Sequence, residues 1–457
     1  MKEMKINRRK FLRKVTSAAI ATTSFSYIVP ASALGKGGRV SPSNRITMGF
    51  IGVGGMGTNN MRAFLNQPDV QVVAVCDVVK ASNEYGHWYT NGWQGPWFGR
   101  ESAQKIVNDY YSQKTQSGGY QGCDAYSDFR DVLARDDIDA VCITTPDHWH
   151  AIPAIMAATA GKHIYCEKPM SLTIAEGRAM IEAVRRYGVI FQTGTQRRSS
   201  QQYRFVCELI RNGRIGRLKR AIAPIGSNNK EAPASNWQPM PVPDWLDYDM
   251  WLGPAPWAPY HKDRCLYTFR FGLDYSGGQT TNLGAHAIDI VQWANGTDNT
   301  GPVEVEDLGG EFPEDGLFTT ATKVHFRARY ENGLELICKT QDDGPLRIEG
   351  TEGWIQIEND KPTYYPESLK TSVIGPNEIQ LYQSNDHHRN FIDCVKAHRE
   401  TAAPIEIGHR SVTICHLGNI AMTLKRKLEW NSEKERFINS EEANRMLCRS
   451  IRSPWCL

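Results

Sequence analysis

Short apolar runs alternate with longer amphipathic segments through the first half of this chain. The apolar runs have the length and content of buried strands, and the segments between them repeat their apolar positions at helical spacing. This alternation predicts a doubly wound parallel sheet with helices on both faces. The strands are expected at 46–51, 70–77, 139–145, 163–166 and 189–193, and the helices at 56–65, 101–113, 128–135, 152–160 and 173–187.

The pattern changes after about residue 196 to strand-like runs in close succession. Such runs without intervening long helices favour an open, mostly antiparallel sheet. We therefore predict two domains, a doubly wound α/β domain over 45–195 and an α+β domain over 196–457. Its strands are expected at 216–225, 322–330, 334–340, 346–350 and 353–357, and helices at 390–397 and 411–428 should return to brace the first domain.

Two aromatic-rich stretches interrupt the pattern. Residues 83–99 form an insertion that could stack on a sugar ring, could seal a subunit contact, or could be a surface loop packed on itself. Residues 233–259 are too rich in proline for regular structure and should form an extended loop. One of its four tryptophans (Trp237, Trp245, Trp251 and Trp257) could reach a sugar site.

A glycine turn directly follows the first strand. Gly52, Gly54 and Gly57 stand in the G-x-G-x-x-G spacing of a dinucleotide site. In such a turn the first glycine permits the bend, the second lets the backbone approach a pyrophosphate, and the third lets the helix pack on its strand. Gly55 and Met56 would add backbone N–H groups at the start of that helix.

An acid, Asp77, ends the second strand 20 positions after Gly57 (77 − 57). A carboxylate at this separation can accept hydrogen bonds from the adenosine ribose. Asp77 would also repel a 2′-phosphate, and neither Val78 nor Val79 could hold one. The sequence therefore predicts NAD as the cofactor in preference to NADP.

Composition narrows the choice of partners. With 457 residues, 40% hydrophobic and 23% charged, the chain has the make-up of a globular enzyme of two or three domains. A net charge of +3 gives no reason to expect nucleic acid or an anionic surface as partner. The 11 cysteines are scattered without a C-x-x-C pair, so we expect buried thiols and no metal site.

The first 34 residues have the layout of an export signal. A basic stretch at 7–14 precedes an apolar stretch at 15–29 and the small residues Ala31, Ser32 and Ala33. Arg8 and Arg9, followed by Phe11 and Leu12, resemble the twin-arginine type. The alternative is a basic disordered tail. The favoured interpretation is a periplasmic protein that begins near Leu34 and has no membrane span once the signal is removed.

The motifs together resemble those of one enzyme family. They are the glycine turn, Asp77, Thr144-Thr145-Pro146 and above all Glu167-Lys168-Pro169, with further matches at 194–198, 251–256, 274–278, 284–289, 387–395 and 408–430. The chain thus resembles the glucose-fructose oxidoreductase / inositol dehydrogenase / rhizopine-catabolism (Gfo/Idh/MocA) family over nearly all of its length after the leader. The resemblance implies a cis Lys168–Pro169 bond and a homo-oligomer formed through the second domain's sheet.

The resemblance also assigns the reacting groups. Lys168 would donate to the reacting oxygen and His286 would be the general acid/base. The family usually has an aspartate four positions before this histidine, whereas this chain has Asn282, which cannot take a proton. The alternatives are that Lys168 is a solvated surface lysine and that His286 has a structural role.

Six further residues near these groups are expected to contact the cofactor or the substrate. Thr145, His150 and Glu167 would contact the cofactor, although His150 could simply cap a helix. Trp149, Arg197 and Asp289 would contact substrate, although Arg197 could be a surface charge. The remaining histidines, His387, His388, His409 and His416, are expected to be structural.

The leading hypothesis is an NAD-dependent oxidoreductase acting on a secondary hydroxyl of a sugar or glycoside, with C3 as one candidate position. Export would separate the enzyme from free nicotinamide, so the NAD should be tightly held and recycled in place. The alternative is a redox-assisted glycoside hydrolase that oxidises transiently, eliminates the aglycone, adds water and reduces again. A non-catalytic carbohydrate-binding protein is the third possibility.

Overall fold

The computed structural model describes residues 40–83, 98–115, 119–226, 236–341 and 344–457. The chain divides into two units, Met1–Arg45 and Ile46–Leu457. In the first, the described part holds one short 3₁₀ helix, η1 (Pro42–Asn44). The expected leader (1–34), the aromatic residues of the insertion (84–97) and the start of the proline-rich loop (233–235) lie outside the described residues.

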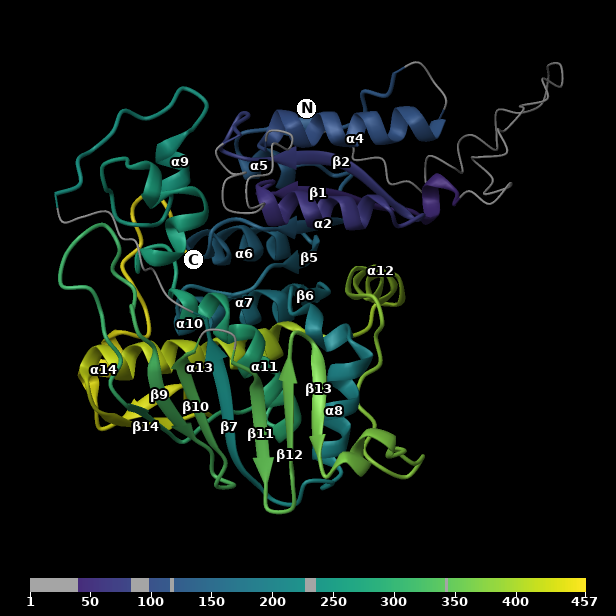
Figure 1. Cartoon of the computed structure of the whole chain (residues 1–457). Helices are drawn as coiled ribbons and strands as arrows, with labels where there is room; N and C mark the ends of the chain where they lie inside the picture. The colour runs from purple at the N-terminus through teal and green to yellow at the C-terminus, as the bar shows by residue number, and fades with distance from the viewer. Residues whose placement is uncertain (1–39, 84–97, 116–118, 227–235, 342–343) are drawn as a thin grey trace, which may run out of the picture. The chain divides into compact units, whose positions relative to one another are not determined.

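The second unit begins with a parallel sheet of six strands within the described residues, in the order β3-β2-β1-β4-β5-β6 (Figure 1). The strands are β1 (Ile46–Ile51), β2 (Val70–Cys76), β3 (Asp124–Tyr126), β4 (Ala140–Ile143), β5 (His163–Cys166) and β6 (Phe191–Thr193). The helices are α2 (Gly55–Leu65), α4 (Arg100–Thr115), α5 (Phe129–Leu133), α6 (Ala151–Thr159) and α7 (Ile174–Tyr187). The predicted doubly wound sheet is confirmed.

This sheet is buried on both faces, as continuous apolar strands require. Phe50 and Val75 pack in the core on one face, and Ile51 and Cys76 pack on the other. The strand order reverses between β1 and β4, and an open α/β sheet binds its ligands beyond the strand ends at such a point.

The second sheet has nine strands in the described part of the chain, in the order β13-β12-β11-β7-β10-β9-β8-β14-β15. All neighbours pair antiparallel except β7 with β10. The strands are β7 (Leu218–Ile225), β8 (Glu304–Asp307), β9 (His325–Arg329), β10 (Glu335–Thr340), β11 (Leu346–Gly350), β12 (Trp354–Glu358), β13 (Lys361–Tyr365), β14 (Lys427–Asn431) and β15 (Arg436–Ile438). The prediction of a mostly antiparallel sheet is confirmed, although four strands (β8, β13, β14 and β15) were not predicted.

Three helices pack on one face of the second sheet: α8 (Gln201–Arg211), α11 (Gly284–Asn295) and α13 (Ile405–Leu424). Helix α13 also contacts α7 and β6, so it lies between the two sheets (Figure 1). The predicted helix over 411–428 was wrong at its end. Lys425 takes the left-handed conformation with φ 54° and ends the helix, and the chain then enters β14. A lysine in this position gives no stop signal of the kind that glycine would.

Helix α12 (His387–Ala397) packs against the nucleotide domain. Phe391 and Ile392 are fully buried and join the core that contains Phe64. The carboxylate of Asp69 pairs with Arg389, at 2.6 Å from Nη1, and with Lys396. Residues from the end of the chain therefore complete the core of the first domain.

A segment of the second domain crosses to the carboxyl end of β2. Leu246 forms an antiparallel bridge with Val79, and the Lys80 N–H donates to the Trp245 carbonyl at 2.8 Å. The segment continues through α9 (Tyr248–Leu252), η4 (Lys262–Arg264) and η5 (Leu266–Phe271). These backbone contacts place a wall from the second domain against the nucleotide-binding end of the first sheet.

The remaining short elements are η2 (Asp147–Trp149), η3 (Gln196–Ser199), α10 (Gln279–Asn282), η6 (Glu367–Thr371) and α14 (Glu441–Arg445). Nine cysteines are buried thiols, and the exposed Cys448 and Cys456 are also free. None of the helices in the described residues is both long enough and apolar enough to cross a bilayer. Within the same residues, no cluster of histidine, cysteine and acidic side chains could hold a metal ion.

Candidate active site

The glycine turn between β1 and α2 has the close approaches that its spacing predicts. Gly52 has φ +84°, and a Cβ there would lie 2.8 Å from the backbone of Thr144. A Cβ on Gly57 would lie 2.0 Å from the Gly52 carbonyl oxygen. Only glycine fits at either position. Helix α2 therefore starts against the strand end, with Gly54, Gly55, Met56 and Gly57 all on the cavity wall.

Asp77 lies at the end of β2 beside this turn. Its two carboxylate oxygens accept from the backbone N–H groups of Val53 (2.8 Å) and Val79 (2.9 Å). Burial raises the pKa of Asp77 to about 6, and the two N–H donors oppose that effect. The carboxylate is therefore mostly ionised at neutral pH, and its remaining lone pairs can still accept from hydroxyl groups.

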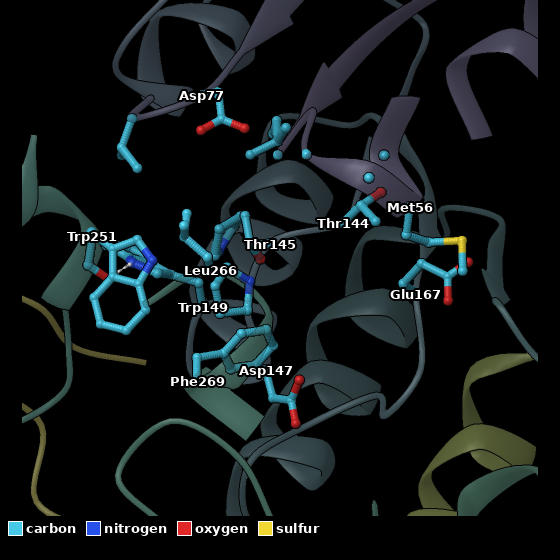
Figure 2. A pocket seen from close by; sticks show the side chains of 18 of the residues that line it. Met56, Asp77, Thr144, Thr145, Asp147, Trp149, Glu167, Trp251, Leu266 and Phe269 are labelled. Atoms are coloured by element: carbon cyan, nitrogen blue, oxygen red, sulfur yellow. Dashed lines mark hydrogen bonds between the residues drawn. The ribbon is translucent and has the colours of Figure 1, made fainter. Parts of the chain in front are cut away.

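A cavity of about 420 Å³ runs from the glycine turn to the second domain. In Figure 2, Asp77 lies at the top of this cavity, Glu167 on the right, Asp147 at the bottom and Trp251 on the left. The first domain contributes the ends of β1, β2, β4 and β5, and the second contributes α9, η5 and Asn282. The ligand site is therefore built at the strand ends, where the order of the first sheet reverses.

Glu167, at the end of β5, is held by neutral donors. Its Oε1 accepts from Asn60 Nδ2 at 3.0 Å and from Gln196 Nε2 at 2.9 Å. Gly194 leaves room for this carboxylate, since a Cβ there would lie 2.7 Å from it. Glu167 and the neighbouring Thr145 both line the cavity, and the buried Thr145 Oγ1 has no hydrogen-bond partner among the described residues. A ligand hydroxyl or amide could satisfy that group.

Lys168 meets the second domain directly. Its Nζ donates to both the backbone oxygen and the Oδ1 of Asn282, each at 3.1 Å. Burial lowers the pKa of Lys168 to about 8; Glu167 opposes this effect, whereas the charge of Arg270 adds to it. The Lys168–Pro169 bond is cis, as the resemblance implies. The structure thus brings Lys168 and Asn282 together at one end of the cavity.

His286 lies in the first turn of α11, four residues after Asn282, but not on the cavity wall. Its Nδ1 is buried without a partner in the described part of the chain. Burial, with the charges of Lys168 and Arg197, lowers the pKa of His286 well below its usual value. The ring is therefore neutral at pH 7 and can accept a proton, but a proton from the cavity would have to be relayed to it.

Besides His286, three predicted site residues lie off the cavity wall. The nitrogens of His150 lie 2.7 Å from the Pro169 carbonyl oxygen and 2.9 Å from that of Thr145, so the ring ties two strand-end turns together. Arg197 points toward Asp360, 3.7 Å away.

Asp289 is the third, and it pairs with the fully buried Arg198 at 2.9 Å. The structure does not bring His150, Arg197 or Asp289 to the cavity wall, and the roles expected of them stay predictions.

Trp149 lines the cavity, and its Nε1 donates to the Met250 carbonyl at 3.0 Å. Trp455, near the C-terminus, packs edge-on against it with ring centroids 4.7 Å apart. Trp251 also lines the cavity, so one tryptophan of the proline-rich stretch does reach the site. The contact between Trp455 and Trp149 connects the C-terminal segment to the cavity wall.

Several lining residues were missed at the sequence level, chiefly on η5: Leu266, Tyr267, Phe269 and Arg270. Arg270 Nε donates to Asn282 Oδ1 at 3.3 Å, and its Nη1 donates to the Tyr267 carbonyl at 2.8 Å. An arginine among alternating aromatic residues was the available signal. Arg270 belongs to no sequence motif, and only the fold brings it close to Lys168.

These features fit a dinucleotide. The glycines leave space for a backbone-bound pyrophosphate, the start of α2 supplies N–H groups, and Asp77 can accept from a ribose. The far end of the cavity holds Lys168, where a nicotinamide and a substrate hydroxyl would meet. The fold and this site define an NAD-binding oxidoreductase of two domains.

The comparisons with known proteins agree. A model described as "Oxidoreductase family, C-terminal alpha/beta domain" matches residues 226–457, and one described as "Oxidoreductase family, NAD-binding Rossmann fold" matches residues 95–195. The chain belongs to the Gfo/Idh/MocA oxidoreductase family.

Two named relatives match parts of the chain. A glycosyl hydrolase family 109 protein of Shewanella pealeana is 31% identical over 193 residues, which span 40% of this chain and only 38% of that protein. An uncharacterised oxidoreductase, YrbE, of Bacillus subtilis is 26% identical over 60% of this chain and 73% of its own length.

Among solved structures, the WlbA dehydrogenase from Bordetella pertussis in complex with NADH and UDP-GlcNAcA has a TM-score of 0.56 at 17% identity. That alignment covers 85% of this chain and 99% of the dehydrogenase. At this identity the likeness supports the fold alone.

Proposed function

We propose that this protein oxidises a secondary hydroxyl of a sugar or glycoside with a tightly held NAD. The observation that carries the proposal is a single cavity with the glycine turn at one end and the Lys168–Asn282 pair at the other. A cofactor bound along the turn would present its nicotinamide beside the lysine, where a substrate hydroxyl can be placed.

Bound NAD would supply a hydride acceptor, so that the carbinol hydrogen would leave with both electrons of the C–H bond while the hydroxyl hydrogen leaves as a proton and a carbonyl forms. Lys168 orients the reacting oxygen: two of its N–H groups are donated to Asn282, and the ammonium form has a third for the substrate. Asn282 fixes the lysine. The unpartnered Nδ1 of His286 is the proposed acceptor of the proton, which would have to be relayed from the cavity and passed on because burial disfavours the charged ring.

The test is turnover by the full chain, followed through nicotinamide absorbance with a panel of glycosides. Lys168→Gln should lower kcat by about a hundredfold or more while NAD binding is retained. Lys80→Gln, a 57% exposed lysine outside the cavity, is the control and should keep full activity. Unchanged turnover in Lys168→Gln would contradict the role of the lysine, whereas glycoside binding without any turnover by the wild type would favour a non-catalytic carbohydrate-binding protein.

We also propose NAD rather than NADP, because an ionised Asp77 would repel a 2′-phosphate. Mass measurement of the nucleotide that remains after extensive dialysis tests both points. Retained NAD supports them, and a nucleotide-free protein with millimolar affinity contradicts tight binding.

A redox-assisted glycoside hydrolase is the second candidate, favoured by the glycosyl hydrolase family 109 relative. The sugar would be oxidised, lose its aglycone by elimination, take up water and be reduced again, so that nicotinamide is not consumed overall. Release of aglycone without net change in nicotinamide absorbance would select this function over the dehydrogenase.

Location and assembly complete the proposal. The basic stretch, apolar stretch and small residues of positions 7–33 favour twin-arginine export to the periplasm. A homo-oligomer through the second sheet is supported by that sheet's open face, where Tyr365 is 58% exposed. A mature protein that still begins at Met1 in cells, or a monomer by light scattering, would contradict the respective point.

A further inference from the structure

Two cations face the reacting end of the cavity without a counter-ion. Lys168 and Arg270 both line it, and neither forms an ion pair within 4 Å with a carboxylate of any described residue. They share one neutral acceptor, Asn282 Oδ1, at 3.1 and 3.3 Å. Unpaired cations in a partly enclosed site are costly unless a ligand neutralises them.

The carboxylates of Glu167 and Asp147 favour the charge of Lys168 but form no ion pair with it or with Arg270. Glu167 accepts from Asn60 and Gln196, and Asp147 accepts from Ser276 Oγ at 2.5 Å. The Asn282 side chain that contacts both cations is a neutral amide, so it leaves their positive charge in place.

The guanidinium of Arg270 is fixed in one orientation. Asn282 and the Tyr267 carbonyl take one N–H each, and the rings of Tyr267 and Phe269 lie 4.5 and 4.7 Å from its central carbon. The other three N–H groups, both on Nη2 and one on Nη1, have no partner in the described residues. Two parallel N–H groups match the two oxygens of a planar carboxylate.

We propose that Arg270 binds a carboxylate on the substrate, so that the sugar oxidised beside Lys168 is a uronic acid or its glycoside. This inference rests on the proposed function, since it assigns the substrate class of the same site. The pyrophosphate of a cofactor is a less suitable partner for Arg270, because its place is the glycine turn and Arg270 is bonded at the Asn282 end.

The experiment uses matched pairs of probes: methyl β-glucuronide against methyl β-glucoside, and methyl β-galacturonide against methyl β-galactoside. Binding to the NAD-loaded full chain is measured by calorimetry, and kcat/KM by nicotinamide absorbance. At least one uronide should bind about tenfold or more tightly than its neutral partner. Glucose 6-phosphate, a non-planar sugar anion, should bind more weakly than that uronide.

Arg270→Gln should abolish the preference by weakening uronide binding about tenfold to a hundredfold, which is more than it weakens binding of the neutral partner. Arg270→Lys, which keeps the charge but loses the fork, should fall between the two. Arg264→Gln is the matched control. It removes a cation from the same segment that stacks on Trp237, off the cavity wall, and should keep the preference.

Equal binding within both pairs, binding of no uronide, tighter binding of the phosphate, or a loss confined to NAD affinity would each overturn the inference. These outcomes are separable from the proposed function. Neutral glycosides that reduce nicotinamide without a uronide preference uphold the oxidoreductase and remove the inference. Uronide-selective binding without any change in nicotinamide absorbance would uphold carboxylate binding by Arg270 and contradict the oxidoreductase.

Discussion

Replacing Asn282 with aspartate exchanges one amide nitrogen for an oxygen at the point where the two domains meet. In the native protein, Oδ1 accepts from Lys168 Nζ at 3.1 Å, and the pKa of Lys168 is about 8 because burial disfavours its charge. A carboxylate in this place would favour the ammonium form. The substitution therefore tests whether this contact sets the protonation state of the lysine.

The magnitude follows from the distance. At 3.1 Å and an effective dielectric constant of about 20, a unit negative charge attracts the ammonium by about 5 kcal/mol. Arg270, which contacts the same oxygen at 3.3 Å, shares that charge, and burying the carboxylate has its own cost. We therefore expect a net rise in the pKa of Lys168 of about one to three pH units.

Competitive acetylation with acetic anhydride, followed by peptide mass spectrometry, measures this pKa without a substrate, because only the neutral amine reacts. In the wild type, labelling of Lys168 should be half-maximal near pH 8. In Asn282→Asp the midpoint should lie about one unit or more higher.

The control is Asn295→Asp, which adds the same charge at the last residue of α11, about 17 Å along the axis from Gly284. It should leave the midpoint in place. If Asn282→Asp also leaves it within about half a unit of the wild type, the contact does not govern Lys168 and the account of the site is wrong.

Three further changes test other parts of the structure. Gly57→Ala should abolish NAD binding, measured by fluorescence titration, because its Cβ would lie 2.0 Å from the Gly52 oxygen; retained affinity would contradict the close approach. Trp455→Ala should weaken NAD binding about two- to tenfold through the loss of its contact with Trp149, while Trp257→Ala, at a 70% exposed site, should not. Asp69→Asn should lower the unfolding free energy in urea by about 1 to 2 kcal/mol at pH 7. Burial raises the pKa of Asp69, but its ion pairs with Arg389 and Lys396 outweigh this and lower the pKa to about 2 from 3.8. That stability is present above the unfolded pKa and is lost as pH falls from about 4 to about 2, so a variant still equally destabilised near pH 2 would refute the assignment.

The sequence by itself determined the first domain and its cofactor end. Apolar runs of strand length, the spacing of Gly52, Gly54 and Gly57, and the separation of Asp77 are local patterns, and local backbone sterics decide what they form. The same holds for Lys168, which follows a predicted strand end. Four strands of the second sheet escaped prediction because their pairing depends on distant partners, as with β14 between β8 and β15.

Only the tertiary structure decided which polar groups meet. Asp289 and Arg197 carry charges that suit a substrate, yet Arg198 and Asp360 engage them, and no sequence spacing shows that pairing. Arg270 belongs to no motif and reaches Lys168 because the segment containing Leu246 is bonded to the end of β2. The positions of the first domain's strands and glycine turns follow from short-range preferences. The partner of a charged side chain is instead chosen by long-range packing, which fixes the substrate end of this cavity.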